Sequence, residues 1–155
     1  MTKNWRELRV RFSVDENQPN ESIALQALGI AWGMVAANEA YFALHPDAPC
    51  CLGCAGVRYV PPEQCGPHCQ LCDTAGVVLQ RRVATCLSAA AYACAKLRVK
   101  GTPATLWLAP MAEGDGGIIP GQFHMVVRMP NGQIVDPTEK LKREPGTCQG
   151  EVCDV

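Results

Sequence analysis

The chain has 155 residues, of which 48% are hydrophobic, so its length and composition suit one globular domain with a buried core. Lys and Arg number 14 against 15 Asp and Glu, and without a net positive charge the chain is not expected to bind nucleic acid. We find no charged leader before an apolar stretch and no unbroken apolar run of about 18 residues, so we expect a cytoplasmic protein with no membrane span.

The first 45 residues predict a strand and a long helix. Apolar and charged residues alternate from Trp5 to Val14, which is typical of a half-buried strand. After a polar turn, apolar residues recur at helical spacing from Ser22 to Leu44, and Pro46 stands where that pattern stops. We therefore expect a helix over residues 22–44, with both elements serving as scaffold.

The segment 46–73 is rich in proline and cysteine, so little regular structure is expected there. Two Cys-x-x-Cys pairs lie in it, and 14 residues separate them. A two-residue gap lets one turn present two sulfurs to one ion, and structural zinc takes four tetrahedral ligands. We therefore predict a structural zinc ion. The predicted ligands are Cys51, Cys54, Cys69 and Cys72, with Cys50, Cys65 and His68 as further candidates.

Disulfides and free thiols remain open as alternatives for these cysteines. Zinc is favoured for two reasons. The expected cytoplasmic setting keeps thiols reduced. A long segment with few large apolar side chains also cannot order itself by burial alone, whereas a metal ion can fix it.

A run rich in alanine predicts a helix that presents a cysteine at its start. Thr85 is suited to cap the helix, no Gly or Pro interrupts the run to Arg98, and Gly101 and Pro103 stop it. Cys86 then lies in the first turn. Unpaired backbone N–H groups and the positive end of the helix dipole favour a thiolate there.

The sequence after this helix predicts an antiparallel sheet. Residues 102–109 read as a strand. Phe123–Met129 and Gln133–Asp136 read as a hairpin joined by Pro130-Asn131-Gly132. Alternation places His124 on the opposite face from the more continuous apolar row.

The register of this hairpin decides whether Asp136 can reach His124, since a shift of one residue moves every side chain to the other face. A three-residue loop, with Gly132 in the left-handed conformation, pairs Val126 with Asp136. His124 and Asp136 then share a face as diagonal neighbours. We predict that the Asp136 carboxylate orients the imidazole while its other ring nitrogen serves Cys86.

These motifs resemble the transglutaminase-like family of papain-like cysteine enzymes. The resemblance rests on four features in order: the helix-opening Cys86, Arg98 near the helix end, Gly101-Thr102-Pro103-Ala104, and the His124 strand followed by Asp136-Pro137-Thr138. The chain is also similar to short transglutaminase-like proteins encoded by tailed phages. That second similarity rests on Ala31-Trp32, His45-Pro46, Gly56-Val57-Arg58-Tyr59 and Asp136-Pro137.

The resemblance implies an α+β fold in which the nucleophile helix packs on a small antiparallel sheet. It implies one domain over residues 1–141, with the cysteine-rich segment 46–73 as an insertion. Residues 142–155 are expected to form a flexible tail.

The resemblance also implies cysteine-dependent acyl transfer on a protein or peptide amide, of the peptidase, amidase or transglutaminase type. Cys86, His124 and Asp136 would form the catalytic triad. Gln80 is a candidate donor to the oxyanion, by analogy with papain-type enzymes. An alternative from another class is a zinc-stabilised, inactive structural or assembly component of a phage particle, in contact with phage structural proteins and associated with the virion.

Overall fold

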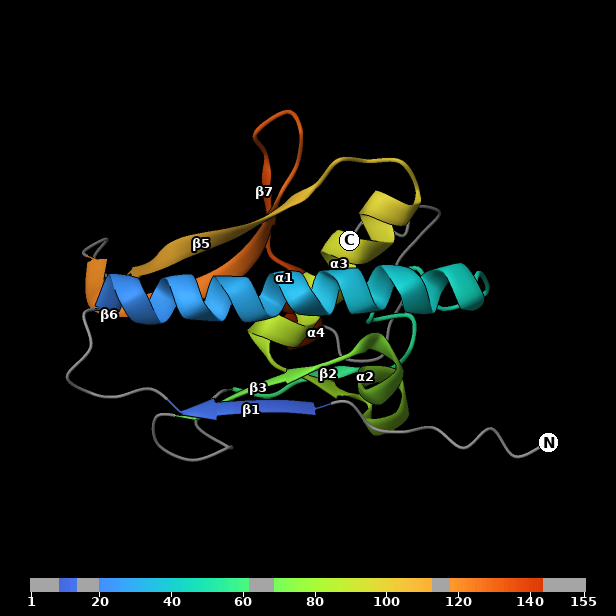
Figure 1. Ribbon diagram of the computed structural model, residues 1–155, viewed down its shortest axis with the longest axis horizontal. Helices are drawn as coiled ribbons and strands as arrows, with labels where there is room; N and C mark the ends of the chain where they lie inside the picture. Colours follow the sequence, from blue (N-terminus) through green and yellow to red (C-terminus); the bar gives the residue numbers. More distant parts are fainter. Residues whose placement is uncertain (1–8, 14–19, 62–68, 113–117, 144–155) are drawn as a thin grey trace.

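The described part of the chain forms a mixed helical and sheet structure, which confirms the predicted α+β class (Figure 1). The computed structural model describes residues 9–13, 20–61, 69–112 and 118–143. In chain order the elements are β1 (Arg9–Ser13), α1 (Asn20–Leu44), β2 (Arg58–Tyr59), β3 (Cys69–Asp73), α2 (Ala75–Arg81), β4 (Val83–Ala84), α3 (Cys86–Val99), β5 (Thr105–Ala112), β6 (Ile118–Arg128), β7 (Ile134–Val135) and α4 (Pro137–Arg143).

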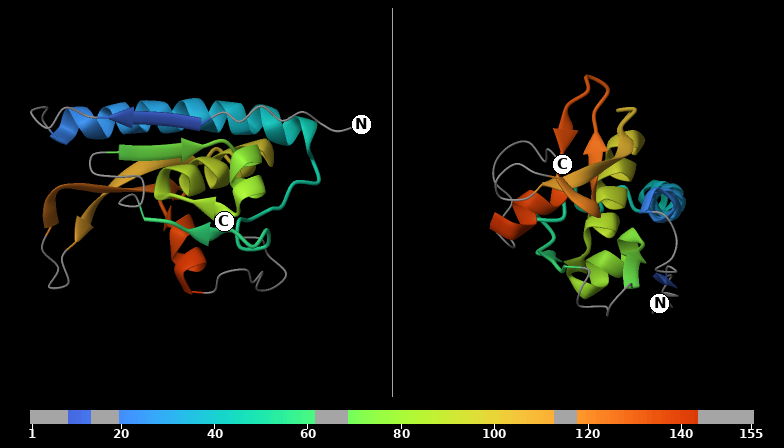
Figure 2. Two further views of the ribbon diagram at one scale, coloured as in Figure 1. Left: turned by 90° about the horizontal axis from the view of Figure 1, so that it is seen from below. Right: turned by 90° about the vertical axis from the view of Figure 1, so that its left-hand side faces the viewer.

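Within the described ranges the strands form three small sheets. β5, β6 and β7 make an antiparallel sheet with β6 in the middle, β1 pairs antiparallel with β3, and β2 pairs parallel with β4. The long helix α1 runs along one side of the molecule (Figures 1 and 2). The predicted packing of the cysteine-bearing helix on a small antiparallel sheet is present, because α3 contacts β6.

Helix α3 lies at the centre of the core. Every residue from Cys86 to Lys96 is buried, and α1, β6 and α4 all contact this helix. Five of those residues are alanines, whose small side chains let neighbouring elements approach closely while keeping a high helix propensity. The opposing side of α1 supplies larger apolar groups, among them Val35 and Phe42, and the Phe42 ring meets Tyr92 edge to face at 4.9 Å.

Helix α1 buries one face against α3 and exposes the other. By length and composition alone its Ser22–Leu44 segment, with a mean hydropathy of 1.2, is apolar enough to cross a membrane. The core helix of a soluble protein meets the same test, and α1 packs on α3 along its buried side. The expectation of no membrane span therefore stays a prediction.

The sequence did not predict two of the helices, α2 and α4. α2 lies shortly before α3 in the chain. α4 covers 137–143 and so extends past residue 141, after which a flexible tail was expected. Helices of seven residues gain little from propensity and depend on tertiary contacts. α2 has such a contact at its start, where the Ala75 N–H donates to Asn38 Oδ1 at 2.7 Å. Residues 144–155 lie outside the described residues.

The hairpin has the predicted register. The Met129 N–H donates to the Gln133 carbonyl at 2.8 Å, and Val127 pairs with Val135. Gly132 has φ 87°, the left-handed conformation that the three-residue loop requires. Asp136 follows Val135 and so lies opposite Val126, on the face that carries His124.

We predict that Gly132→Ala lowers the free energy of unfolding by about 1 kcal/mol, because an L side chain is strained at this φ. Gly29→Ala is the matched control. Gly29 lies in α1 with no atom within 4 Å of an added Cβ, so alanine there should raise stability by about 0.5–1 kcal/mol through helix propensity. Urea unfolding of both variants measures the contrast, and equal effects would contradict the turn geometry.

Candidate functional site

Cys86 is the first residue of α3, as predicted, and its side chain is largely buried. Thr85 caps the helix: its hydroxyl accepts a hydrogen bond from the Ser88 N–H at 3.3 Å. Ser88 in turn accepts from the Asp73 N–H at 2.8 Å, which ties the first turn of α3 to the end of β3. The cysteine is thus held at a helix start whose position is fixed by the adjoining strand.

His124 connects Cys86 to Asp136. Its Nε2 lies 2.7 Å from Asp136 Oδ2, and Cys86 is close enough to the ring to raise the pKa of His124. The His124 and Asp136 side chains are 18% and 20% exposed, so the pair is shielded but reachable. Because Nε2 faces the carboxylate, Nδ1 is the nitrogen left for the thiol. The structure therefore brings the three predicted residues together.

Thr138 also belongs to this arrangement, although the sequence alone predicted no role for it. Its hydroxyl donates to Asp136 Oδ1 at 2.7 Å and lies 3.3 Å from His124 Nε2. Its backbone N–H donates to the same Oδ1 at 2.9 Å. Asp136 is thus the N-cap of α4, with Pro137 at the first helical position, a common helix start. The Asp-Pro-Thr-Glu sequence carried this signal, and it also marks the start of the helix that was missed.

The contacts of His124 and Asp136 shift both pKa values in the directions of an ion pair. The hydrogen bond that His124 donates to Asp136, followed by its interaction with Cys86, raises the pKa of His124 to about 9, although burial opposes the shift. Burial acts to raise the pKa of Asp136, but the hydrogen bonds from His124 and Thr138 outweigh it and hold the pKa at about 2. At neutral pH the pair is therefore imidazolium and carboxylate.

Gln80 lies in the last turn of α2 with its side chain exposed. Arg82, two residues later, adopts the left-handed conformation and ends the helix. No hydrogen bond joins Gln80 to Cys86 or His124 among the described residues. A role for Gln80 in an oxyanion hole stays a prediction.

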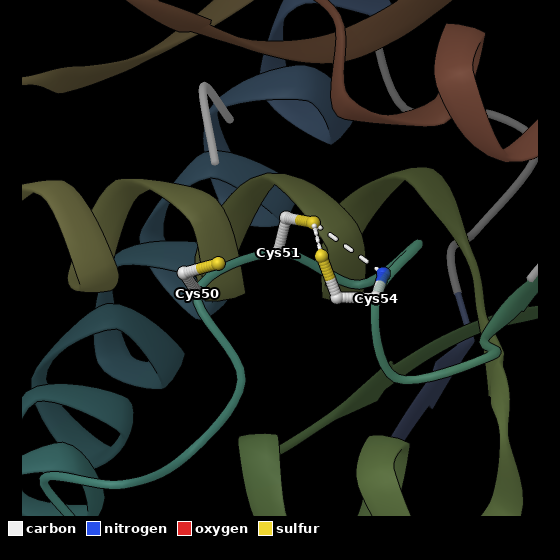
Figure 3. Close-up of side chains that lie close together, drawn as sticks. All are labelled: Cys50, Cys51 and Cys54. Atoms are coloured by element: carbon white, nitrogen blue, oxygen red, sulfur yellow. Dashed lines mark hydrogen bonds between the residues drawn. The ribbon is translucent and has the colours of Figure 1, made fainter. Parts of the chain in front are cut away.

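Three cysteines gather in the loop after α1 (Figure 3). The sulfurs of Cys50, Cys51 and Cys54 all lie within 4.8 Å of one another. Cys51 Sγ lies 2.8 Å from Cys54 Sγ and accepts a hydrogen bond from the Cys54 N–H at 3.4 Å. Three sulfurs this close can hold a metal ion.

Polar groups of α3 hold this loop in place. The Tyr92 hydroxyl donates to the Pro49 carbonyl at 2.5 Å, and Lys96 Nζ donates to the Ala48 carbonyl at 2.8 Å. Further along the loop, Arg82 donates to the Ala55 carbonyl. The three cysteines therefore lie near the middle of α3, away from its start at Cys86.

The predicted set of four zinc ligands is corrected by the position of Cys72. Cys72 does not belong to the three-cysteine group; its thiol is fully buried in the core. Burial, followed by the nearby Asp73 and Cys86, raises its pKa to about 12. Cys72 lies near the start of α3, because β3 pairs with β1 and the Asp73 N–H donates a hydrogen bond to Ser88. Cys65, His68 and the Cys69 side chain lie outside the described residues.

The oxidation state of the group decides what it can bind. Cys50 and Cys54 each take part in a disulfide bond, whereas Cys51 is a free thiol. A metal ion is held by thiolates, so Cys50 and Cys54 can serve as ligands only after reduction. Disulfide and metal are therefore mutually exclusive states of these two cysteines.

No family model, curated protein or solved structure matches the chain.

We predict that the His124–Asp136 pair stabilises the fold over a limited pH range. The pKa of Asp136 falls from 3.8 to about 2 on folding, so its contribution is full above about pH 4 and is lost toward pH 2. The pKa of His124 rises from 6.5 to about 9, so its contribution is full below about pH 6.5 and is lost above pH 9.

Urea unfolding of the wild type and of Asp136→Asn at a series of pH values measures this contribution. The difference in unfolding free energy between them should be largest between about pH 4 and 6.5. A difference that does not change with pH would contradict the ion pair. The chain has three histidines, so NMR can follow His124 individually; its pKa should fall well below 9 in Asp136→Asn.

Proposed function

We propose that the chain is a cysteine-dependent acyl-transfer enzyme that acts on an amide of a protein or peptide. The observation that carries the proposal is the position of His124, which is hydrogen-bonded to Asp136 and lies beside Cys86. A buried cysteine on an alanine-rich helix and a histidine on a strand are each common. A histidine that lies beside a cysteine and is hydrogen-bonded to a carboxylate is typical of a site for nucleophilic catalysis.

The proposed reaction uses the Cys86 thiolate as nucleophile, with the His124 imidazolium beside it. Its sulfur attacks the amide carbonyl carbon, and backbone N–H groups at the start of α3 are suited to stabilise the resulting oxyanion. The C–N bond then breaks as His124 gives its proton to the leaving amine, which leaves a thioester on Cys86.

The second half of the proposed reaction regenerates the enzyme. Neutral His124 takes a proton from water or from a primary amine, which attacks the thioester carbonyl and releases Cys86 as thiolate. Water gives hydrolysis, and an amine gives transamidation. Asp136 keeps the ring oriented and stabilises the imidazolium each time it forms.

The proposed fold is a papain-like or transglutaminase-like core. The supporting features are a cysteine at the start of a buried helix, a neighbouring antiparallel sheet that carries the histidine on its middle strand, and an aspartate just after the next strand. These features occur in the order that the sequence resemblance implies. Gln80 and the N–H groups at the start of α3 are the proposed oxyanion donors.

We predict that Cys86→Ala lowers acyl transfer by at least about 1,000-fold, because no other group can form the thioester. With casein as substrate, new amino termini, released ammonia and incorporation of a dansylated primary amine distinguish peptide hydrolysis, deamidation and transamidation. Cys94→Ala, in the same buried helix, is the control and should retain activity. Wild-type rates no higher than those of Cys86→Ala in all three assays would refute the proposal.

Thiol labelling tests the same proposal without a substrate. Iodoacetamide at pH 7 should modify Cys86 faster than Cys94, because burial raises the pKa of Cys94 to about 11 and keeps it protonated. Mass spectrometry of peptides from the labelled protein gives both rates. Equal rates would argue against an activated Cys86.

A second candidate function is that of a zinc-stabilised structural or assembly module, for example in a phage particle. The observation that favours it is the three-sulfur group, which α3 holds through Tyr92 and Lys96. Zinc prefers thiolates, and three of them leave one tetrahedral position for another ligand. In this reading the metal orders the loop and Cys86 has no chemical task.

We predict that the reduced protein binds about one zinc ion per chain and that Cys51→Ser loses it, because Cys51 is close to both other sulfurs. Cys94→Ser is the control and should bind zinc like the wild type. Metal analysis after reduction, gel filtration and removal of free zinc measures both. Reduced protein without zinc, or undiminished binding by Cys51→Ser, would exclude this site.

A further inference from the structure

We infer that Thr138 is a positioning residue for the proposed triad: its hydroxyl and N–H fix the rotation of the Asp136 carboxylate so that one oxygen faces His124. This inference rests on the proposed function. Thr138 touches no reacting atom, so it would act only through Asp136 and His124.

The two carboxylate oxygens of Asp136 have different hydrogen-bond partners. Asp136 Oδ1 accepts two hydrogen bonds, from the Thr138 hydroxyl at 2.7 Å and from its N–H at 2.9 Å. Asp136 Oδ2 is 2.7 Å from His124 Nε2. Rotation of the carboxylate would break the bonds on both sides at once. The two donors on Oδ1 therefore hold Oδ2 against the imidazole.

Thr138 is completely buried, with 0% of its surface exposed. Water cannot replace its hydroxyl as a donor, so loss of the hydroxyl leaves Oδ1 with one bond fewer. The branched side chain also has few rotamers in a helix, which keeps the hydroxyl beside the carboxylate. The same hydroxyl lies 3.3 Å from His124 Nε2, so it borders the bond that it supports.

Thr138 belongs to a helix that is docked on the rest of the structure. α4 contacts α3 and β2, Leu141 is buried, and Lys142 Nζ lies 4.7 Å above the Tyr59 ring. The helix α4 is therefore anchored independently of the triad. Because Thr138 hydrogen-bonds to the Asp136 carboxylate, the docking of α4 fixes the position of Asp136 relative to β6, the strand that carries His124.

Thr138→Val tests the inference, because valine keeps the shape and the N–H but removes the hydroxyl. With casein as substrate, kcat should fall about tenfold with KM changed less than twofold, and Thr138→Ser should restore most of it. Thr74→Val is the control: Thr74 precedes α2 and its side chain makes no capping hydrogen bond. Wild-type kcat in Thr138→Val, or no recovery in Thr138→Ser, would overturn the inference.

An NMR measurement separates this inference from the proposed function. Carbon-13 shifts of the Asp136 carboxyl give its pKa, which should rise from about 2 toward 3.8 in Thr138→Val and return in Thr138→Ser. If the wild type lacks acyl-transfer activity, this readout still decides: a shift that serine reverses supports positioning, and an unchanged pKa refutes it. If Thr138→Val does not fold, Thr138→Ala and Thr138→Ser, which differ only in the hydroxyl, replace it in both experiments.

Discussion

The structure depends on the burial of α3. Residues Cys86–Lys96 are all buried, so the helix has to be covered on every side. α1, β6, α4 and the loop after α1 provide that cover. Alanine side chains keep the helix thin enough for these elements to approach. The polar ends of Tyr92 and Lys96 bond to loop carbonyls, which avoids the cost of an unpaired buried polar group.

The candidate active site lies at the start of α3, where α3, β6 and α4 meet. Asp136 has two tasks there, since one oxygen caps α4 and the other faces His124. The geometry of the site is therefore coupled to the docking of α4. A helix of only seven residues thus has a direct influence on a carboxylate in the proposed triad.

Five of the described cysteines lie in two regions along the same helix. Cys72 and Cys86 lie toward its start, whereas Cys50, Cys51 and Cys54 lie against its middle. Spacing along the chain cannot reveal this division. Two Cys-x-x-Cys pairs look equivalent in sequence, but Cys72 belongs to a strand whose pairing and hydrogen bonds carry its sulfur into the core.

The sequence by itself determined the features that depend on local chemistry. Thr85 as a cap, the uninterrupted alanine run and the left-handed Gly132 act over a few residues, so they fixed where α3 begins and the register that puts His124 and Asp136 on one face. Tertiary structure decided the rest. The helices α2 and α4, the burial of Cys72 and the hydroxyl of Thr138 beside Asp136 depend on contacts between elements distant in sequence or on their docking, and no local pattern specifies such contacts.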